Sequence, residues 1–472
     1  MDLYDNFNGY LPEQCEYASK VKTLLEQREI INPKAHIVTF GCQQNVSDSE
    51  RIKGMLVLCG YTLTEEIDEA DFILFNTCAV RGHAEDRVYG NVGATKKLKQ
   101  ANPNLMVAVC GCMAQQQSVA DKFYKSYPYV DIVFGTQQYH RLPEFIYRRM
   151  TSKRVYELGL DNSKIVENIP VCRDGKIKGW LPIMYGCNNF CTYCIVPYVR
   201  GRERSRDPQE IVKEATQMVQ NGFKEIMLLG QNVNSYGKGE SHGVNFAKLL
   251  RMINDIDGDF RIRFMTSHPK DCTEELLDAI RDCEKVERHI HLPFQSGSSK
   301  ILKQMNRKYD REAYLKLIKA ARKRIPDVEF TSDIIVGFPG ETYEDFCETL
   351  SLVKKVKFTS LFTFIYSPRE GTPAAEMPDP ITREEKGKWF DQLLATQDKI
   401  SDKLNRSLVG KKVRVLCEER IESGLYTGKT EYYSSVIFPG KPEMIGKFVD
   451  VCITRYMKNK LFGVTLKSKE DL

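Results

Sequence analysis

Three cysteines close together in the sequence, Cys187, Cys191 and Cys194, could hold an iron–sulfur cluster. Their spacing, C-x3-C-x2-C, places three thiolates on one short loop directly after the apolar run of residues 180–185. A cubane cluster has four irons, so three cysteines leave one iron open to a ligand that is not part of the protein. The alternatives are a zinc site or three buried cysteines. Zinc usually takes four ligands, often from two C-x2-C pairs, and the sequence has no second pair.

The cysteine spacing, with the aromatic residue Tyr193 directly before the last cysteine, resembles the radical S-adenosylmethionine (SAM) superfamily. The resemblance implies that the open iron holds SAM through its amino and carboxylate groups. It also implies that an electron passes from the cluster into the sulfonium of SAM. We therefore expect Tyr193 to lie among the residues that bind this cofactor.

A second set of three cysteines follows the predicted strands of the N-terminal part. Apolar runs at residues 36–40, 72–75 and 105–109 end close to Cys42, Cys78 and Cys112. A fourth predicted strand covers residues 131–135, and helical stretches follow each strand. Continuous apolar strands that alternate with helices predict a doubly wound parallel sheet, covered on both faces. The carboxyl ends of such strands form the edge that binds ligands. The sequence therefore predicts that the fold assembles a second cluster site from three separate strands.

Buried cysteine is also a common core residue, and this reading stays open for any single one of these positions. We expect it to hold for Cys59 and Cys110. Three cysteines at equivalent strand ends are less easily explained as core residues, which favours the cluster.

Six more predicted strands follow between residues 180 and 380, with helical patterns between them. They cover residues 181–185, 225–229, 261–266, 289–293, 329–336 and 361–366. Six βα units in series predict an open, partial (β/α)6 barrel. Barrel chemistry lies at the carboxyl ends of the strands, where the C-x3-C-x2-C loop follows the first strand.

Other polar residues and glycines lie at or near the same predicted strand ends. Glycine lets the backbone approach a nucleoside closely, and amide and hydroxyl groups suit the ribose and the methionine portion of SAM. Each position alone could equally be an ordinary turn. The residues that we expect to contact the cofactor besides Tyr193 are Gly230, Gln231, Ser267, Gln295, Asp333 and Gly337.

Four arginines follow the cluster loop at alternating positions, Arg200, Arg202, Arg204 and Arg206. They could be a solvated loop. Because the run borders the cluster loop, we expect contact with RNA phosphates at the mouth of the site.

The composition is typical of a globular protein. The chain has 472 residues, enough for about three domains, with 42% hydrophobic and 28% charged residues. Fifteen cysteines favour metal ligation over disulfides in a reducing compartment. No apolar stretch reaches the roughly 18 residues of a membrane span, and the polar N-terminus does not predict a secretory signal. We expect a cytoplasmic protein without membrane contact.

The C-terminal segment changes character after residue 409. About five short predicted strands suit a small antiparallel barrel of the OB kind. From Val409 to the end there are 12 Lys or Arg and 8 Asp or Glu, a balance of +4 within a total of +6. Tyrosines at positions 426, 432, 433 and 456 interleave with these charges. Basic residues interleaved with aromatic ones predict an RNA-binding surface, and an inert β cap is the alternative.

These motifs, in this order, resemble the radical-SAM methylthiotransferase family over nearly all of the chain after residue 34. The motifs are Gly41–Asn45, Asn76–Cys78, Cys110–Cys112 and the C-x3-C-x2-C triad. Residues 185–201, 229–234 and 291–298 resemble most the branch that modifies isopentenylated adenosine in tRNA. One departure is Asn188–Asn189, where an acidic residue is expected first. The resemblance implies an N-terminal extension (1–34), a methylthiotransferase domain (35–150), a radical-SAM domain (173–405) and a TRAM domain (408–471).

The resemblance also implies the reaction and its cofactors. Two [4Fe–4S] clusters are expected, one on Cys187, Cys191 and Cys194 and an auxiliary one on Cys42, Cys78 and Cys112. SAM would be both the source of a 5′-deoxyadenosyl radical and the methyl donor. The substrate would be the anticodon stem-loop of a tRNA with N6-isopentenyladenosine next to the anticodon, methylthiolated at C2. We expect a monomer that takes electrons from a low-potential donor such as flavodoxin or ferredoxin.

Two other functions stay open at this point. Sister enzymes methylthiolate threonylcarbamoyladenosine in tRNA or an aspartate of a ribosomal protein. A protein of another class, a non-catalytic RNA-binding metalloprotein, would need no cluster with an open iron.

Overall fold

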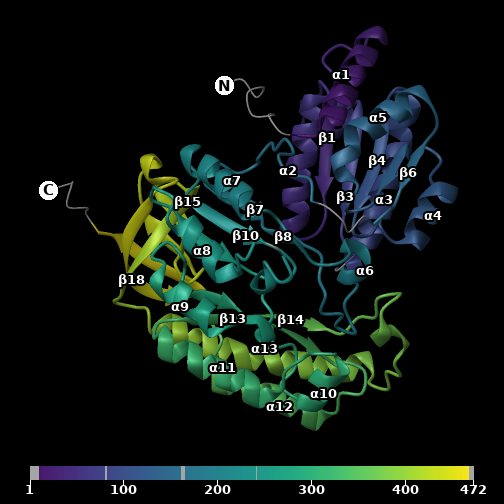
Figure 1. Ribbon diagram of the computed structural model, residues 1–472. Coiled ribbons are helices and arrows are strands. Elements are labelled where there is room, and N and C mark those ends of the chain that lie inside the picture. Colours follow the sequence, from purple (N-terminus) through teal and green to yellow (C-terminus); the bar gives the residue numbers. More distant parts are fainter. Residues whose placement is uncertain (1–9, 80–81, 161–164, 241, 467–472) are drawn as a thin grey trace. The chain divides into compact units, whose positions relative to one another are not determined.

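The protein was analysed as a computed structural model that describes residues 10–79, 82–160, 165–240 and 242–466 (Figure 1). Side chains of residues 82–86 are not described. The ends of the expected N-terminal extension and TRAM segment, residues 1–9 and 467–471, lie outside this part. By its contacts the chain forms two compact units. The first unit comprises residues 1–175, 182–188 and 194–210, and the second comprises residues 176–181, 189–193 and 211–472. Each unit is described by itself.

The first unit contains a six-stranded parallel sheet in the order β2-β1-β3-β4-β5-β6. The strands are β1 (Lys34–Thr39), β2 (Thr62–Leu63), β3 (Phe72–Thr77), β4 (Met106–Gly111), β5 (Ile132–Phe134) and β6 (Val155–Glu157). The four predicted strands are present, and the short strands β2 and β6 were not predicted. The chain turns from β1 to β2 on one side and then continues with β3 on the other. The strand order therefore reverses between β1 and β3, and such a reversal is where open α/β sheets bind ligands.

Helices cover both faces of this sheet (Figure 1). The helices are α1 (Pro12–Gln27), α2 (Gln43–Leu58), α3 (Gly82–Ala101), α4 (Gln117–Ser126) and α5 (Leu142–Thr151). Alternate residues of β3 face opposite cores, with Leu74 packing with α1, α2 and α5 and Phe75 packing with α3 and α4. Both faces are thus apolar, which confirms the doubly wound fold. Cys59 and Cys110 are buried in the first core, as predicted.

The second unit contains the strands of an open barrel, in two three-stranded sheets of order β7-β10-β11 and β12-β13-β14. These strands are β7 (Lys178–Pro182), β10 (Glu225–Leu229), β11 (Arg261–Phe264), β12 (His289–His291), β13 (Glu329–Val336) and β14 (Ser360–Ile365). A parallel bridge between Ile262 and Val286 lies where the two sheets adjoin. The connecting helices are α7 (Pro208–Gln220), α8 (Phe246–Asn254), α9 (Glu274–Asp282), α10 (Ser299–Gln304), α11 (Arg311–Arg324) and α12 (Tyr343–Val356), and α13 (Arg383–Arg406) follows β14. The predicted partial (β/α)6 barrel is confirmed.

The predicted strand 181–185 differs from what the structure contains. Strand β7 ends at Pro182, and a separate strand β8 (Met184–Tyr185) pairs antiparallel with β9 (Arg204–Ser205) in the first unit. At the interruption, the backbone N–H of Arg206, 23 residues along the chain, donates to the carbonyl of Ile183 over 2.9 Å.

Residues 412–465 form a closed five-stranded barrel in the order β15-β16-β17-β19-β18. The strands are β15 (Lys412–Glu422), β16 (Leu425–Thr430), β17 (Ser435–Pro439), β18 (Phe448–Met457) and β19 (Lys460–Thr465). All neighbouring pairs are antiparallel except β17 and β19. Its core is lined by alternate strand residues such as Val415, Phe438 and Ile453. The predicted small β-barrel is confirmed.

Within the second unit, this C-terminal barrel packs on the amino ends of the open-barrel strands. Arg261, the first residue of β11, donates to the carbonyl of Lys429 over 3.0 Å. The ring of Tyr433 stacks on that of His289, the first residue of β12, with centroids 6.3 Å apart. The C-terminal barrel therefore leaves the carboxyl ends of the strands, where the chemistry is expected, on the opposite side. No helix among the described residues is long and apolar enough to cross a membrane.

Candidate functional site: two cysteine sets and a nucleoside edge

Cys42, Cys78 and Cys112 lie at the carboxyl edge of the parallel sheet in the first unit. Cys78 directly follows β3, Cys112 directly follows β4, and Cys42 is the N-cap of α2, just past β1. These strands are neighbours, and β1 and β3 flank the reversal of strand order. The structure thus brings the predicted auxiliary cysteines to one place.

Gly41 lets the Cys42 loop approach Cys78 closely. Its φ of +127° lies in a region that side chains rarely adopt. A Cβ built on Gly41 would lie 2.6 Å from the Cβ and 3.1 Å from the Sγ of Cys78. Any larger residue would therefore push into the space around the Cys78 sulfur.

A buried amide fixes the first turn of α2 to the end of β3. Asn45 Nδ2 donates to the carbonyl of Thr77 over 2.9 Å, and its Oδ1 lies 3.4 Å from the Sγ of Cys42. Asn76 Nδ2 returns a bond of 2.9 Å to the carbonyl of Asn45. The sequence analysis named Asn45 only as the last residue of the Gly41–Asn45 motif. Its place at the third helical position after a cysteine N-cap was the available signal for its role.

Three cysteine thiols are the kind of donor set that holds an iron–sulfur cluster. No group of three or more His, Cys, Asp or Glu side chains in the described part of the chain is arranged to hold one metal ion. In a cubane, each cysteine ligates a different iron, so the sulfurs need to surround the cluster rather than meet at one atom. Burial raises the pKa of the Cys112 thiol to about 12, and the Arg200 guanidinium opposes that rise. Iron binding must therefore displace a proton that burial otherwise retains.

Arg200 points toward the auxiliary cysteines. It ends the short helix α6 (Val196–Arg200), and its Nε lies 3.2 Å from the Sγ of Cys112. Its Nη2 donates to Asp48 over 2.9 Å. The side chain is buried, which corrects the prediction that Arg200 contacts RNA phosphate.

The other arginines of the run differ in exposure. Arg206 is buried and forms an ion pair of 2.6 Å with Glu167, so it too is placed inside the first unit rather than toward phosphate. Arg204 is half-buried and lines a cavity of the first unit together with Tyr185 and Ile169. Arg202 is exposed. Phosphate contact therefore remains a prediction for Arg202 and Arg204.

Part of the C-x3-C-x2-C loop belongs to the first unit. Cys187 is buried, and its backbone N–H donates to the carbonyl of Gly201 over 3.2 Å. A Cβ on Gly186 would lie 2.0 Å from the carbonyl oxygen of Arg202, so only glycine permits this approach. After Cys194, residues Ile195 and Val199 pack in one apolar cluster with Cys112 and Ala79.

The middle of the loop belongs to the second unit. Phe190 has a positive φ of +47°, and its carbonyl accepts a bond of 2.9 Å from Asn306. Cys191 is buried, and Nη1 of Arg307 lies 3.5 Å from its Sγ. The sequence analysis did not identify Arg307, which lies in an unremarkable Asn-Arg-Lys stretch after α10. The three cysteines share one loop of eight residues, on which Cys187 and Cys191 are buried and Cys194 is half-buried.

Tyr193, predicted to lie by the cofactor, packs in the second unit against an apolar cluster that includes Met305, Phe338 and Tyr366. The backbone N–H of the neighbouring Thr192 donates to the carbonyl of Met305 over 3.2 Å. The packing orients the last part of the loop.

The segment after β10 carries buried amide atoms without a hydrogen-bond partner. They are Gln231 Oε1, Asn232 Oδ1 and both amide atoms of Asn234. Buried polar atoms are nearly always paired, so such a group points to a ligand. Asn232 is held by its Nδ2, which donates to Asp271 over 2.7 Å. These amides fit the polar groups of SAM, and they include the predicted Gln231 beside Gly230.

The other predicted SAM residues lie at successive strand ends of the same unit. Ser267 follows β11, and its hydroxyl donates to the carbonyl of His291. Gln295 follows β12 with a positive φ of +67°, and its N–H donates to the carbonyl of Asp333 over 3.0 Å. The Asp333 carboxylate lies 3.5 Å from the ring of His291. Gly337, with a φ of +73°, follows β13 and donates to the buried carboxylate of Glu341.

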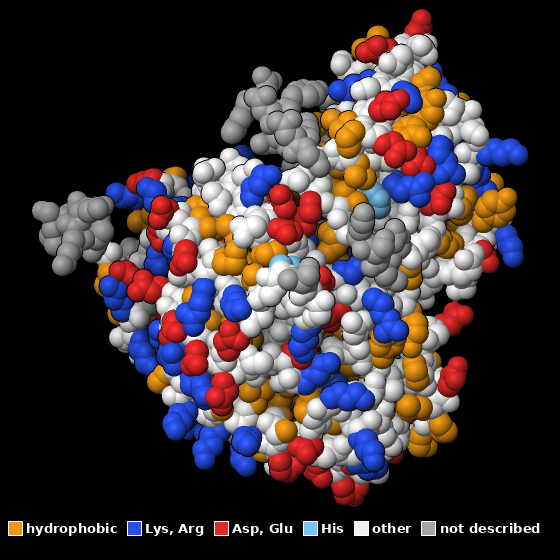
Figure 2. Space-filling model, viewed as in Figure 1, with side chains coloured by type: hydrophobic (Ala, Val, Ile, Leu, Met, Phe, Trp, Pro, Cys, Tyr) orange, Lys and Arg blue, Asp and Glu red, His pale blue; other side chains and the backbone are white. Residues whose placement is uncertain are grey.

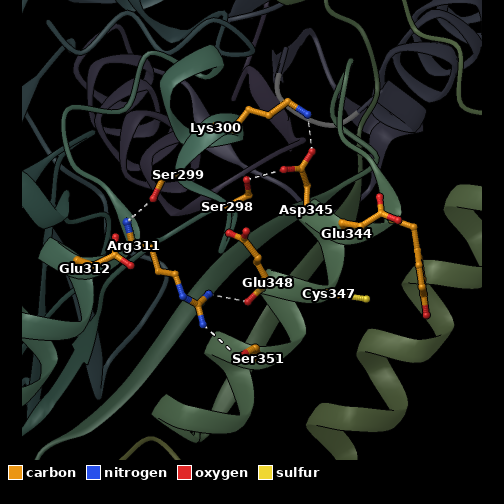
Figure 3. A pocket seen from close by; sticks show the side chains of 11 residues that line it. Ser298, Ser299, Lys300, Arg311, Glu312, Glu344, Asp345, Cys347, Glu348 and Ser351 are labelled. Atoms are coloured by element: carbon orange, nitrogen blue, oxygen red, sulfur yellow. Dashed lines mark hydrogen bonds and ion pairs between the residues drawn. The ribbon is translucent and has the colours of Figure 1, made fainter.

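A broad surface depression of the second unit lies outside this edge (Figure 3). It is lined by residues of α10, α11 and α12, and its basic side chains Lys300 and Arg311 are hydrogen-bonded to neighbouring groups. Lys300 and Ser298 both contact Asp345, over 2.7 Å each. Arg311 reaches the carbonyl of Glu348 and the hydroxyl of Ser351. We assign it no ligand.

Three family models match the chain. The Radical SAM superfamily matches residues 181–353, the uncharacterized protein family UPF0004 matches residues 34–135, and the TRAM domain matches residues 406–466. A solved structure of the radical S-adenosylmethionine methyltransferase TsrM from Kitasatospora setae superposes with a TM-score of 0.54 at 14% identity. The match covers 73% of this chain and 77% of that chain, and it is a likeness of fold alone.

Close relatives match over nearly the whole chain and are tRNA-2-methylthio-N(6)-dimethylallyladenosine synthases. The one from Caldicellulosiruptor saccharolyticus is 50% identical over 434 residues, 92% of each chain. The one from Alkaliphilus oremlandii is 49% identical over 459 residues, 96% of this chain and 98% of the relative. The one from Clostridium beijerinckii is 52% identical over 430 residues, 90% of this chain and 94% of the relative.

Proposed function

The chain belongs to the tRNA-2-methylthio-N6-dimethylallyladenosine synthases, a family of radical-SAM methylthiotransferases, and we propose that it methylthiolates C2 of N6-isopentenyladenosine in tRNA. The modified base lies next to the anticodon. The enzyme uses two [4Fe–4S] clusters, and SAM serves as both radical source and methyl donor.

One observation supports the two-cluster proposal most directly. Cys112 packs in a single apolar cluster with Val199 and with Ile195, which directly follows the last cysteine of the C-x3-C-x2-C loop. Cys194 and the auxiliary cysteines thus belong to the same compact unit. A radical reaction followed by sulfur insertion needs the two centres to share one substrate atom, and this packing supports such an arrangement.

The roles of the protein groups follow from their positions. Cys187, Cys191 and Cys194 would hold one cluster with an open iron, and Cys42, Cys78 and Cys112 the other. With both clusters and SAM in place, the chemistry available is reductive cleavage of SAM at one site and delivery of a methylated sulfur at the other.

The remaining groups would bind and orient the nucleoside part of the cofactor. Gln231, Asn232 and Asn234 offer unpaired amide atoms. Gly337 lets the backbone approach closely because its φ is positive.

The partners follow from the same proposal. The substrate is the anticodon stem-loop of an isopentenylated tRNA, and Arg202 and Arg204 are its candidate phosphate contacts near the loop. A low-potential protein such as flavodoxin or ferredoxin supplies electrons. We propose a monomer that works in the cytoplasm, where reduced clusters and tRNA are both present.

Family membership decides between the functions left open by the sequence. The relatives named above all carry the dimethylallyladenosine name, which favours isopentenyladenosine over threonylcarbamoyladenosine or a ribosomal aspartate. A non-catalytic RNA-binding protein would not need the radical-SAM match across residues 181–353.

The test is anaerobic reconstitution of the full chain with iron and sulfide, followed by reaction with SAM, a reductant and tRNA that carries unmodified isopentenyladenosine. Mass spectrometry of the digested nucleosides should show the 2-methylthio derivative and 5′-deoxyadenosine. A matched control is tRNA that carries threonylcarbamoyladenosine. If only the control tRNA gains a methylthio group, the substrate proposal is wrong while the family assignment stands.

A further inference from the structure

A buried arginine that the reaction scheme does not use lies against the auxiliary cysteines. Nε of Arg200 is 3.2 Å from the Sγ of Cys112, and the side chain is only 5% exposed. Its Nη2 contacts Oδ1 of Asn45 at 3.3 Å, and the same oxygen lies 3.4 Å from the Sγ of Cys42. The guanidinium therefore touches one cysteine directly and a second through one amide.

The position of Arg200 is fixed by its backbone as well as by its side chain. The carbonyl of Arg200 accepts a bond of 2.9 Å from Nε2 of Gln137, and the carbonyl of Val199 accepts a bond of 2.5 Å from the hydroxyl of Thr136. Both donors follow β5 in the parallel sheet. The helix that carries Arg200 is therefore tied to the same sheet edge as the cysteines, and this arrangement aims the guanidinium at Cys112.

We propose that Arg200 is a positioning residue that holds the Cys112 thiolate by an N–H···S bond and makes the auxiliary cluster easier to reduce. The inference rests on the proposed function, since it requires that Cys42, Cys78 and Cys112 hold a cluster. Hydrogen bonds to the sulfurs and the net charge around a cluster set its reduction potential. A buried cation is poorly screened, so it stabilises the extra electron of the reduced state.

Asp48 should modulate this effect with the opposite sign. Its carboxylate accepts from Nη2 of Arg200 over 2.9 Å and is itself buried. It neutralises part of the guanidinium charge, and its own negative charge also acts on Cys112. Removing the arginine and removing the carboxylate should therefore shift the cluster potential in opposite directions, which a general loss of packing would not do.

The test is a reductive titration of the full-length, two-cluster enzyme followed by electron paramagnetic resonance. The auxiliary signal is identified as the one retained in the Cys187→Ala, Cys191→Ala, Cys194→Ala variant. Arg200→Gln should shift this signal to a more negative potential, Arg200→Lys should shift it less, and Asp48→Asn should shift it to a more positive potential. The signal of the other cluster should stay in place.

Arg206→Gln is the matched control, because Arg206 is a buried arginine of the same segment whose ion pair is with Glu167. It should leave the auxiliary potential unchanged. If Arg200→Gln fails to load its cluster, Arg200→Lys and Asp48→Asn decide the matter.

Two results would overturn the inference. One is an auxiliary potential in Arg200→Gln equal to that of Arg206→Gln; the other is no positive shift in Asp48→Asn. A different failure concerns the proposed function itself. If the variant without Cys187, Cys191 and Cys194 binds no iron, then the auxiliary cluster does not exist and both proposals fall. If that variant binds iron but Arg200→Gln does not shift the auxiliary potential, only the proposed role of Arg200 is wrong.

Discussion

The guanidinium of Arg263 donates a hydrogen bond of 2.6 Å to the backbone carbonyl of Thr430, and this contact joins the open barrel to the C-terminal barrel. Arg263 is almost fully buried and also pairs with Glu225 over 2.9 Å. A buried charge is stable only when its hydrogen bonds are satisfied. The carbonyls of the C-terminal barrel therefore complete the pairing of a charge that the open barrel buries.

Replacing Arg263 should destabilise the second unit strongly. Arg263→Leu leaves Glu225 with one guanidinium fewer and should lower the free energy of unfolding by about 3 kcal/mol. Both tryptophans, Trp180 and Trp389, belong to this unit, so urea unfolding followed by tryptophan fluorescence reports on it. The control is Arg414→Ala, whose ion pair with Asp259 is solvent-exposed and should contribute no more than about 1 kcal/mol. Equal losses of stability in the two variants would contradict this account of the interface.

The two cysteine sets should bind iron independently. The triple alanine variant of Cys187, Cys191 and Cys194 should keep about half of the iron and lose all SAM cleavage, because each cluster is held only by its own thiolates. Iron and sulfide analysis and the yield of 5′-deoxyadenosine measure the two effects. A triple variant that still cleaves SAM under reducing conditions would refute the assignment of the open iron.

The auxiliary set should be dispensable for making the radical and essential for inserting sulfur. The triple alanine variant of Cys42, Cys78 and Cys112 should form 5′-deoxyadenosine with isopentenylated RNA but no methylthio product. Cys59→Ala is a matched control, since Cys59 is a buried core cysteine of the same unit. Normal product from the triple variant with added sulfide alone would rule out the auxiliary role.

The sequence predicted the parallel sheet, the open barrel and the C-terminal barrel because each has a strong periodic pattern. β10 and β13 were predicted with the bounds that they have. β2 and β6 were missed, since two and three residues are too few to show a pattern. The break at Pro182 was missed because its cause, the backbone N–H of Arg206, lies far along the chain. A strand that ends through a distant hydrogen bond leaves no local signal.

The cysteines were identified by spacing and by strand ends, but charged residues were not placed correctly. The arginine run was interpreted as a surface because nothing local distinguishes Arg200 from Arg202. Burial is set by distant partners, here Asp48 and Cys112 for Arg200 and Glu167 for Arg206. The tyrosines of the C-terminal barrel show the same limit. Tyr426 lies in its core, and Tyr433 packs against His289 rather than toward RNA.

Glu341 should make the stability of the second unit depend on pH. Its carboxylate accepts the N–H of Gly337 at the candidate SAM edge, and burial raises its pKa from 4.5 to about 7. Because the folded pKa is above the unfolded one, the folded state binds more protons. Stability from this group is therefore present below about pH 4.5 and is lost as pH rises toward 7, by at most about 1.4 kcal/mol per pH unit.

Glu341→Gln should flatten this dependence, because a neutral amide oxygen accepts the same N–H bonds at any pH. Urea midpoints of tryptophan fluorescence at several pH values between 5 and 8 measure it. Glu385→Gln is the control, since Glu385 is an exposed capping residue of α13. A variant with the same pH slope as the natural chain would show that Glu341 does not titrate in this range.

The C-terminal barrel should contact the body of the tRNA through the hairpin of β18 and β19. This hairpin carries the exposed basic residues Arg455, Lys458 and Lys460. It lies at the end of β18 remote from Phe448, roughly 30 Å away along the ten-residue strand at the rise of a β-strand. The guanidinium carbon of Arg261 in the open barrel lies 5.7 Å from the centroid of the Phe448 ring. Figure 2 shows acidic and basic side chains interspersed over the face that it draws.

Replacing Arg455, Lys458 and Lys460 by alanine should weaken binding of full-length tRNA and leave a short anticodon stem-loop nearly unaffected. Phosphate contacts give affinity that falls with salt, so the dependence of log affinity on log salt should flatten by roughly one unit for each phosphate that the variant no longer neutralises. The variant keeps the buried interface at Arg263 intact, which deletion of the barrel would not. The matched control removes the same charge from the exposed face of α11 by replacing Lys316, Lys319 and Lys323. Titrations at several ionic strengths decide the matter: equal salt slopes for the two triple variants would mean that the C-terminal barrel serves the stability of the second unit and does not bind tRNA through this hairpin.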